Sequence, residues 1–229
     1  MIPIVGKHAR EVYVLGQTLG NASQSFSVFG DCQSEPGIFL GPYAADPAAF
    51  EALPPTLQET VRYFEGSLYR FSPTVKAGTT AAALFWPEWH GNEYGCEHTE
   101  SPLDCELHRH NPSFVLIMVG THNEDSRNEY YMRMVLETLL ERGIVPILST
   151  KADNIEGDDH INLEAARLAV EYDLPLWNFW PVTGNLPNRG LYTRNYLGDV
   201  FLTDEALELR RYSALQVLDA VWRAVMGNE

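Results

Sequence analysis

Short runs of apolar residues alternate along the chain with segments in which apolar residues recur at helical spacing. The runs are too uniformly apolar for strands with one solvent-exposed face, so they predict strands buried on both faces of a sheet. These strands are predicted at residues 25–30, 113–120, 144–150 and 174–179. Helices are predicted at residues 4–19, 57–64, 79–85, 127–142, 161–172 and 204–226. In the helix at 161–172, the spacing places Leu163, Ala166 and Val170 on the buried face.

The alternation of strands and helices predicts a parallel sheet, because helices then supply the crossover connections. Residues 67–75 predict a weaker second strand, which gives a sheet of about five strands. We therefore expect a three-layer α/β/α sandwich with flavodoxin-like strand order and with ligands at the carboxyl ends of its strands. Because no repeat or linker divides the sequence, residues 1–229 are expected to form one domain, with residues 1–24 as an outer helical extension.

The charge of the chain narrows the classes of ligand. It has 16 Lys and Arg against 31 Asp and Glu, a formal net charge of -15. A chain this acidic, with no basic cluster, repels phosphate backbones and anionic lipids, so nucleic-acid and membrane-surface binding are not expected. The longest apolar runs, such as residues 114–120, are too short to span a bilayer, so we expect no membrane insertion. The oligomeric state stays open.

The three cysteines divide into a pair and a single residue. Cys96 and Cys105 flank a short polar stretch of the kind that a local disulfide closes, which leaves Cys32 alone. A disulfide favours an extracellular or cell-surface location, in which case a signal segment is missing from this chain, because residues 1–9 lack the apolar core of one. Two free buried thiols and a cytoplasmic location are the alternative.

A turn of small residues follows the first predicted strand and carries Cys32 to the expected ligand-binding edge. Its sequence is Phe-Gly-Asp-Cys-Gln-Ser, and the strand at 113–120 runs into Gly-Thr-His-Asn-Glu. The two turns resemble the Gly-Asp-Ser and Gly-x-Asn-Asp blocks of the SGNH (GDSL-type) hydrolase superfamily. Gly78 falls where the second-block glycine belongs, and residues 198–204 fall where an Asp-x-x-His block precedes the last helix. The resemblance covers roughly residues 25–226.

This resemblance implies ester hydrolysis by the residue at position 32, on a lipid, an acetylated sugar or a small acyl ester. Oxyanion-hole donors would stabilise the negative oxygen of the tetrahedral intermediate. Gly78 and Asn123 are the expected donors, and Asp31 and Ser34 are expected beside them in the site. Neither a metal nor a cofactor is expected.

The sequence also departs from the pattern of the superfamily. Cys32 stands in place of serine, and an ungapped alignment puts His122 on the asparagine position, which a one-residue shift would return to Asn123. In the last block, Phe201 stands where the histidine belongs and Gly198 where the aspartate belongs. The usual general base is therefore absent.

Activation of a thiol normally needs a proton acceptor within hydrogen-bond reach, so the missing base leaves two hypotheses. In the first, Cys32 is partly thiolate near neutral pH and pairs with His122, while Asp199 orients an imidazole; Ser34 is a further substitute nucleophile. In the second, Cys32 is an inert thiol in a catalytically silent relative. Such a relative would bind a saccharide or another ligand, or serve as a module of an extracellular protein.

An oxygen-rich loop follows the strand predicted at 144–150. Its polar side chains are Asp153, Asn154, Glu156, Asp158 and Asp159. Such a set can hold a hard cation, but the spacing does not satisfy the EF-hand pattern. We expect instead that Asp158 or Asp159 caps the helix that starts near Ile161.

Overall fold

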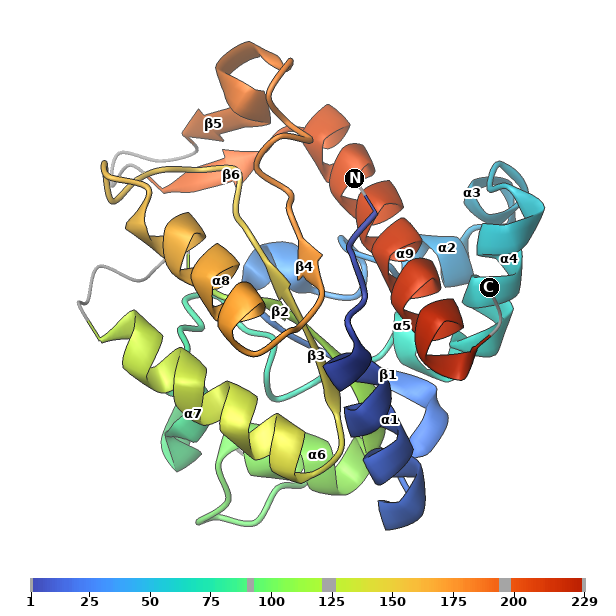
Figure 1. The fold of residues 1–229 in the computed structure, drawn as a ribbon. Helices are drawn as coiled ribbons and strands as arrows, with labels where there is room; N and C mark the ends of the chain where they lie inside the picture. Colours follow the sequence, from blue (N-terminus) through green and yellow to red (C-terminus); the bar gives the residue numbers. More distant parts are fainter. Residues whose placement is uncertain (1, 90–92, 121–126, 194–198, 228–229) are drawn as a thin grey trace.

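A parallel four-stranded sheet with the order β1-β2-β3-β4 lies at the centre of the protein (Figure 1). The structure is a computed structural model and describes residues 2–89, 93–120, 127–193 and 199–227. The strands are β1 (Ala22–Gly30), β2 (Pro112–Met118), β3 (Val145–Ser149) and β4 (Leu176–Trp177). Every residue of β2 is buried, which confirms the inference from its uniformly apolar sequence.

A short extended segment continues the sheet beside β1. Val75 forms an isolated parallel bridge with Gly30, whose N–H donates to the Thr74 carbonyl at 3.0 Å. The segment takes the place of the second strand predicted at 67–75 and completes the flavodoxin-like order. It forms a single bridge and no longer ladder, because the N–H of Thr74, which the next rung would need, donates to the Ser72 hydroxyl at 3.2 Å.

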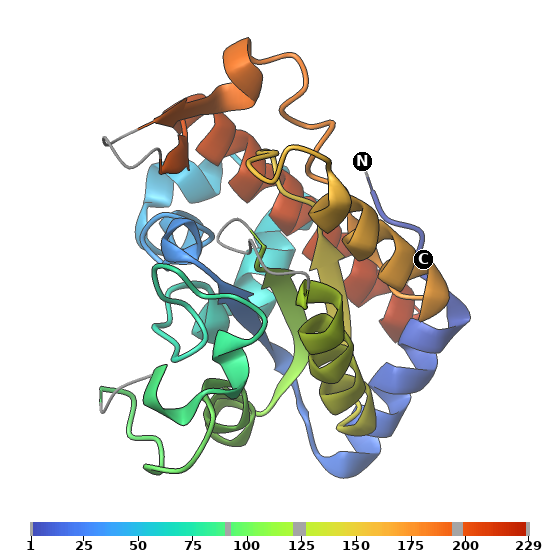
Figure 2. The ribbon, with the colours of Figure 1, turned by 90° about the vertical axis from the view of Figure 1, so that its left-hand side faces the viewer.

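Helices cover both faces of the sheet, which confirms the predicted three-layer sandwich (Figures 1 and 2). On one face lie α1 (Lys7–Leu19), α4 (Pro55–Tyr63) and α9 (Asp204–Met226). On the other face lie α6 (Pro102–His110), α7 (Asn128–Glu141) and α8 (His160–Glu171). Side chains alternate along a strand, so Phe114 and Leu116 of β2 enter the first core while Val115 and Ile117 enter the second.

The connections contain short helices and one hairpin. The short helices are η1 (Cys32–Ser34), α2 (Pro42–Ala45), α3 (Pro47–Glu51), α5 (Glu65–Leu68), η2 (Ala83–Phe85), η3 (Pro87–Trp89) and η4 (Pro187–Gly190). The helix predicted at 79–85 is therefore only the single turn η2. Strands β5 (Leu191–Thr193) and β6 (Val200–Leu202) pair antiparallel outside the main sheet. Over the described ranges, no helix has the length and apolar character that a membrane span needs.

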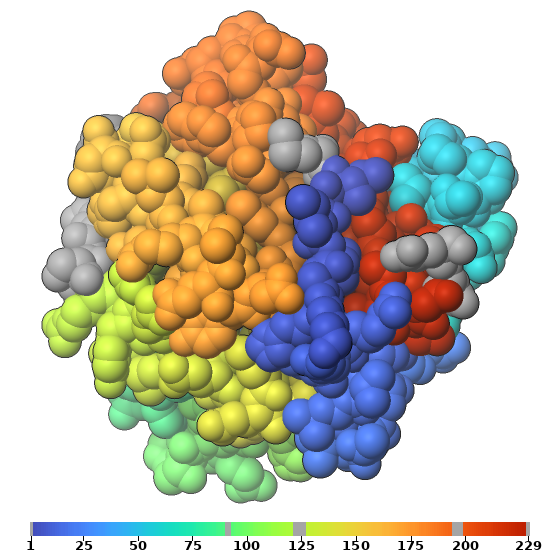
Figure 3. Space-filling view, viewed as in Figure 1, coloured from blue at the N-terminus to red at the C-terminus, as the bar shows by residue number. Residues whose placement is uncertain are grey.

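The N-terminal part of the chain, blue in Figure 3, packs closely on the rest of the protein. A Cβ atom at Gly16 would lie 2.0 Å from the carbonyl oxygen of Gly143, so this approach of two backbones requires glycine. Tyr13 on the same helix stacks on Phe114 of β2 with ring centroids 5.5 Å apart. Strand β1 begins at Ala22, so part of the predicted extension belongs to the sheet.

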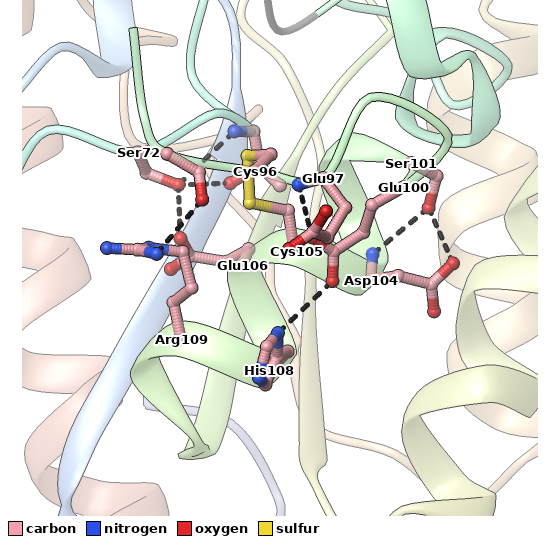
Figure 4. Close-up of a disulfide and its surroundings, with 12 residues drawn as sticks. Ser72, Cys96, Glu97, Glu100, Ser101, Asp104, Cys105, Glu106, His108 and Arg109 are labelled. Atoms are coloured by element: carbon pink, nitrogen blue, oxygen red, sulfur yellow. Dashed lines mark hydrogen bonds and ion pairs between the residues drawn. A yellow bond between two sulfur atoms is a disulfide. The ribbon is translucent and has the colours of Figure 1, made fainter. Parts of the chain in front are cut away.

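The predicted disulfide joins Cys96 and Cys105 and fastens a long loop to α6 (Figure 4). The stretch between them was expected to be a loop, yet α6 begins inside it. Ser101 caps the helix by accepting the N–H of Asp104 at 3.0 Å, and Pro102 occupies the first helical position. The disulfide therefore connects the loop to a helix of the outer layer.

Loss of this disulfide is expected to lower the free energy of unfolding by about 2–3 kcal/mol, because the unfolded chain is less restricted without it. Urea unfolding of the oxidised protein and of the double variant Cys96→Ala, Cys105→Ala measures this difference. The unfolded, unreduced protein should titrate a single thiol, and Cys32→Ala should titrate none. Three titratable thiols in the unreduced chain would refute the bridge.

Candidate active site

The turn after β1 carries Cys32 at the carboxyl end of the sheet. Asp31 caps η1 by accepting the N–H of Gln33 on its carboxylate at 2.9 Å. The Gln33 side-chain oxygen in turn accepts the N–H of Leu202 at 2.8 Å, which ties this turn to strand β6. In Figure 2, the light-blue segment that follows β1 accordingly lies directly beneath the orange hairpin. The predicted first and last blocks thus meet in space.

Cys32 is half-buried and lines a pocket of about 260 Å³. Phe201, which stands at the position expected for the catalytic histidine, lines the same pocket. The two residues thus meet in one pocket, although they are far apart in sequence. Within the described part of the chain, no histidine lines this pocket.

The surroundings of Cys32 disfavour its thiolate. Burial raises the pKa of the Cys32 thiol, and the negative charges of Asp31 and Glu35 raise it further. At neutral pH the side chain is therefore protonated to a greater extent than a solvent-exposed cysteine. This runs against the expectation that the thiol is partly ionised on its own, so nucleophilic attack would need a separate proton acceptor.

Gly78 and Ser34 are both predicted site residues, and they have different places around the Cys32 turn. Gly78 follows the segment that pairs with β1, so it belongs to the loop next to the Cys32 turn. Its φ of +80° is a conformation that favours glycine. Ser34 is 2% exposed, and its Oγ accepts a hydrogen bond from Arg210 at 3.1 Å. Through this hydrogen bond Ser34 helps to hold the turn against α9.

The remaining predicted site positions are Asp199 and three residues outside the described ranges. Asp199 is exposed and directly precedes β6. Three other predicted site positions lie outside the described residues: His122, Asn123 and Gly198. The proposed pairing of Cys32 with His122 therefore stays a prediction from the sequence.

Arg210 is a site residue that the sequence analysis missed. It lies on α9, is 7% exposed, and donates to the Gln33 carbonyl oxygen and to Ser34. Its guanidinium also lies 5.0 Å from the ring centroid of Phe39. The sequence carries one signal for this role, because Arg210 falls at helical spacing between the buried residues Ala206 and Ala214. An arginine on the buried face of a helix needs a polar partner, which here is the Cys32 turn.

A second charged cluster follows β3. The Lys151 ammonium contacts Asp153 at 2.6 Å and also pairs with Glu156, and all three side chains are largely buried. Asp153 and Glu156 of the oxygen-rich loop thus pair with Lys151, in the loop whose oxygens could hold a hard cation. Asp159 occupies the N-cap of α8, but its side chain makes no capping hydrogen bond; the Asp158 carboxylate instead accepts the N–H of His160, the first residue of the helix, at 3.2 Å.

The two charged clusters meet at one small cavity. Asp31, Lys151, Asp153 and Arg210 all line it, and its volume is about 40 Å³. This space holds only a few water molecules, since one water needs roughly 10–15 Å³ of such volume. The Cys32 pocket is therefore the candidate substrate site, and it shares Gln33 and Leu202 with the lining of the small cavity.

The fold is similar to solved structures over nearly its whole length. A protein of Bacteroides fragilis NCTC 9343 described as an acylhydrolase is 14% identical, with 95% of this chain and 96% of that chain covered and a TM-score of 0.55. A GDSL-like lipase of Bacteroides thetaiotaomicron VPI-5482 is 15% identical, with 97% and 100% covered and a TM-score of 0.50. No family model and no curated protein match this sequence. The chain therefore has the fold of the SGNH (GDSL-type) hydrolases, as its motifs indicated.

Proposed function

We propose that this protein is an SGNH-type ester hydrolase in which Cys32 is the nucleophile. The observation that carries the proposal is the pocket that Cys32 and Phe201 share, because these are the positions of nucleophile and base in the resemblance. The similar folds of a protein described as an acylhydrolase and of a GDSL-like lipase support the same reaction class. The proposed substrate is an ester of a lipid, an acetylated sugar or a small acyl group.

In the proposed reaction, His122 takes the thiol proton as the sulfur of Cys32 attacks the carbonyl carbon of the ester. The alcohol leaves with that proton, and water then hydrolyses the thioester, which releases the acid and restores the thiol. The N–H groups of Cys32 and Gly78, together with Asn123, stabilise the negative oxygen of each intermediate. Asp199 orients the imidazole. The raised pKa of Cys32 makes the base essential to this scheme.

A second candidate function is ligand binding without catalysis. Two observations favour it: Cys32 is half-buried near the carboxylates of Asp31 and Glu35, which raises the pKa of its thiol, and an aromatic side chain stands at the position expected for the base. In this case the protein binds a saccharide or another small molecule in the same pocket, or acts as a module of an extracellular protein.

The disulfide supports a proposal on location. Disulfides persist in oxidising compartments and are rare in the cytosol. We propose on this ground that the protein works outside the cell or at its surface.

The wild-type protein is expected to turn over p-nitrophenyl acetate slowly, and Cys32→Ala should abolish the turnover. His122→Ala should lower the rate by about 10²–10⁴-fold, which is the usual contribution of a general base. Steady-state release of p-nitrophenol measures both effects, after subtraction of the single acetylation that any thiol undergoes.

His108→Ala is the matched control for His122→Ala, because the His108 side chain is 72% exposed on α6. It should leave the rate unchanged. A fast rate that survives Cys32→Ala would show that the nucleophile lies elsewhere, with Ser34 the next residue to test. Absence of any turnover would favour the second candidate function.

A further inference from the structure

The walls of the Cys32 pocket are mostly hydrocarbon. Apolar side chains come from three separate parts of the chain, with Ile38 after η1, Phe201 and Leu202 on β6, and Leu207 on α9. Phe201 packs on Tyr192 of β5 with ring centroids 6.0 Å apart, so two aromatic rings form one side. The pocket thus presents an apolar surface directly beside the sulfur.

The polar groups of the pocket disfavour an anionic ligand. The Gln33 side-chain oxygen already accepts the N–H of Leu202, so this amide is engaged within the wall. Glu35 is the acidic residue among the described residues that line the pocket. A carboxylate on the ligand would meet this charge, whereas a neutral chain would not.

The size of the pocket admits such a chain. Its volume is about 260 Å³, against about 40 Å³ for the cavity at the charged clusters, which holds only a few water molecules. An acyl chain longer than acetyl therefore has room beside the sulfur.

We infer that this pocket binds the hydrocarbon chain of a neutral ester whose acyl group is longer than acetyl, with Phe201 and Leu207 as its walls. The inference rests on the proposed function, because it assigns the acyl group of that reaction to this pocket. It narrows the substrate from esters in general to neutral esters with an acyl chain longer than acetyl. Phe201 then has a binding role at the position where the superfamily has its base.

Alkylthiolation of Cys32 tests the pocket without requiring turnover. In a reaction with an alkyl methanethiosulfonate, the Cys32 sulfur attacks the sulfenyl sulfur and a disulfide bond forms. The bond to the sulfonyl sulfur breaks, methanesulfinate leaves with the electron pair, and the thiol proton passes to the buffer. Because Cys96 and Cys105 are joined to each other, Cys32 is the free thiol that mass spectrometry will follow.

The measured quantity is the ratio of the rate constants for hexyl and methyl methanethiosulfonate, divided by the same ratio for N-acetylcysteine. The thiolate fraction of Cys32 cancels in this ratio. Full burial of a methylene is worth about three- to fourfold in affinity, so for a partly open pocket we expect a normalised ratio of at least about ten. The neutral propyl reagent should also outpace the 2-carboxyethyl reagent by at least about threefold, because Glu35 repels the latter.

Leu207→Trp fills the pocket and should bring the normalised ratio to within about twofold of one, because the hexyl chain loses its site. Leu163→Trp is the matched control, since Leu163 is 64% exposed on α8 and should leave the ratio unchanged. Should Leu207→Trp not fold, Ile38→Glu at the 36% exposed rim provides the same test by adding a charge.

A wild-type ratio near one overturns the inference, and so does a high ratio that the folded pocket variants leave unchanged. Equal rates for the propyl and carboxyethyl reagents would overturn the preference for neutral chains. The proposed function fails by a different result. In that case the chain-length ratio is high, so the pocket binds the chain, yet no p-nitrophenyl ester from acetate to octanoate is turned over.

Discussion

The triple variant Cys32→Ser, Gly198→Asp, Phe201→His is expected to hydrolyse p-nitrophenyl acetate at least about tenfold faster than the wild-type protein. Positions 32 and 201 line the same pocket, so an imidazole at 201 can approach a hydroxyl at 32. The imidazole would take the serine proton, and the new aspartate would orient the imidazole. A tenfold gain is well inside the about 10²–10⁴-fold that a positioned general base supplies.

The double variant Cys32→Ser, Phe201→His is the control for the aspartate and should fall below the triple variant in rate. Phe201 is half-buried against Tyr192, so its replacement should lower the free energy of unfolding by about 1–3 kcal/mol, and folding is checked first by circular dichroism. A folded triple variant with its imidazole beside the hydroxyl in a crystal structure, yet without activity, would favour the ligand-binding function.

Arg210→Met is expected to lower the free energy of unfolding by about 3–5 kcal/mol, since removing one member of a buried charged cluster leaves the others uncompensated. The variant removes the cation next to the buried Asp31 and the donors to the Gln33 carbonyl and to Ser34. The turn that carries Cys32 would lose its support from α9. Urea unfolding with matched m-values measures the change.

Arg211→Met is the matched control for this prediction. Arg211 is the next residue on α9; its side chain is 16% exposed and pairs at 3.0 Å with Glu208, whose side chain is 65% exposed. Water screens a pair with one exposed partner, so the pair contributes about 0–1 kcal/mol and the loss of stability should be far smaller than for Arg210→Met. Equal, small losses in the two variants would contradict the role assigned to Arg210.

Elements with a strong local pattern were predicted closely. The last helix was expected at 204–226 and is α9 (Asp204–Met226), and the strand expected at 144–150 is β3 (Val145–Ser149). In α9 a capping residue, Thr203, precedes a long periodic segment, and Gly227 ends it in a left-handed conformation. Such signals are local, so they can be recognised without knowledge of the fold.

Elements that depend on distant contacts were missed or misassigned. On α8 the expected buried face included Leu163 and Val170, yet these are 64% and 83% exposed, whereas Ile161 and Leu168 are buried. The helix has apolar residues on more than one side, and only its packing over the sheet selects the buried one. The hairpin of β5 and β6 was likewise not predicted, because its short strands carry no clear alternation.

By itself, the sequence determined the parallel α/β sandwich and the position of Cys32 at the carboxyl end of the first strand, and it places phenylalanine at position 201, where the resemblance to the SGNH hydrolases implies a histidine. These follow from apolar runs, turn residues and motif order, all of which are local features of the chain. Only the tertiary structure decided that Cys32 and Phe201 share a pocket and that Arg210 and Lys151 are buried with their partners. Burial and Coulomb interactions depend on distances between side chains that are far apart in sequence, and neither periodicity nor spacing specifies those distances.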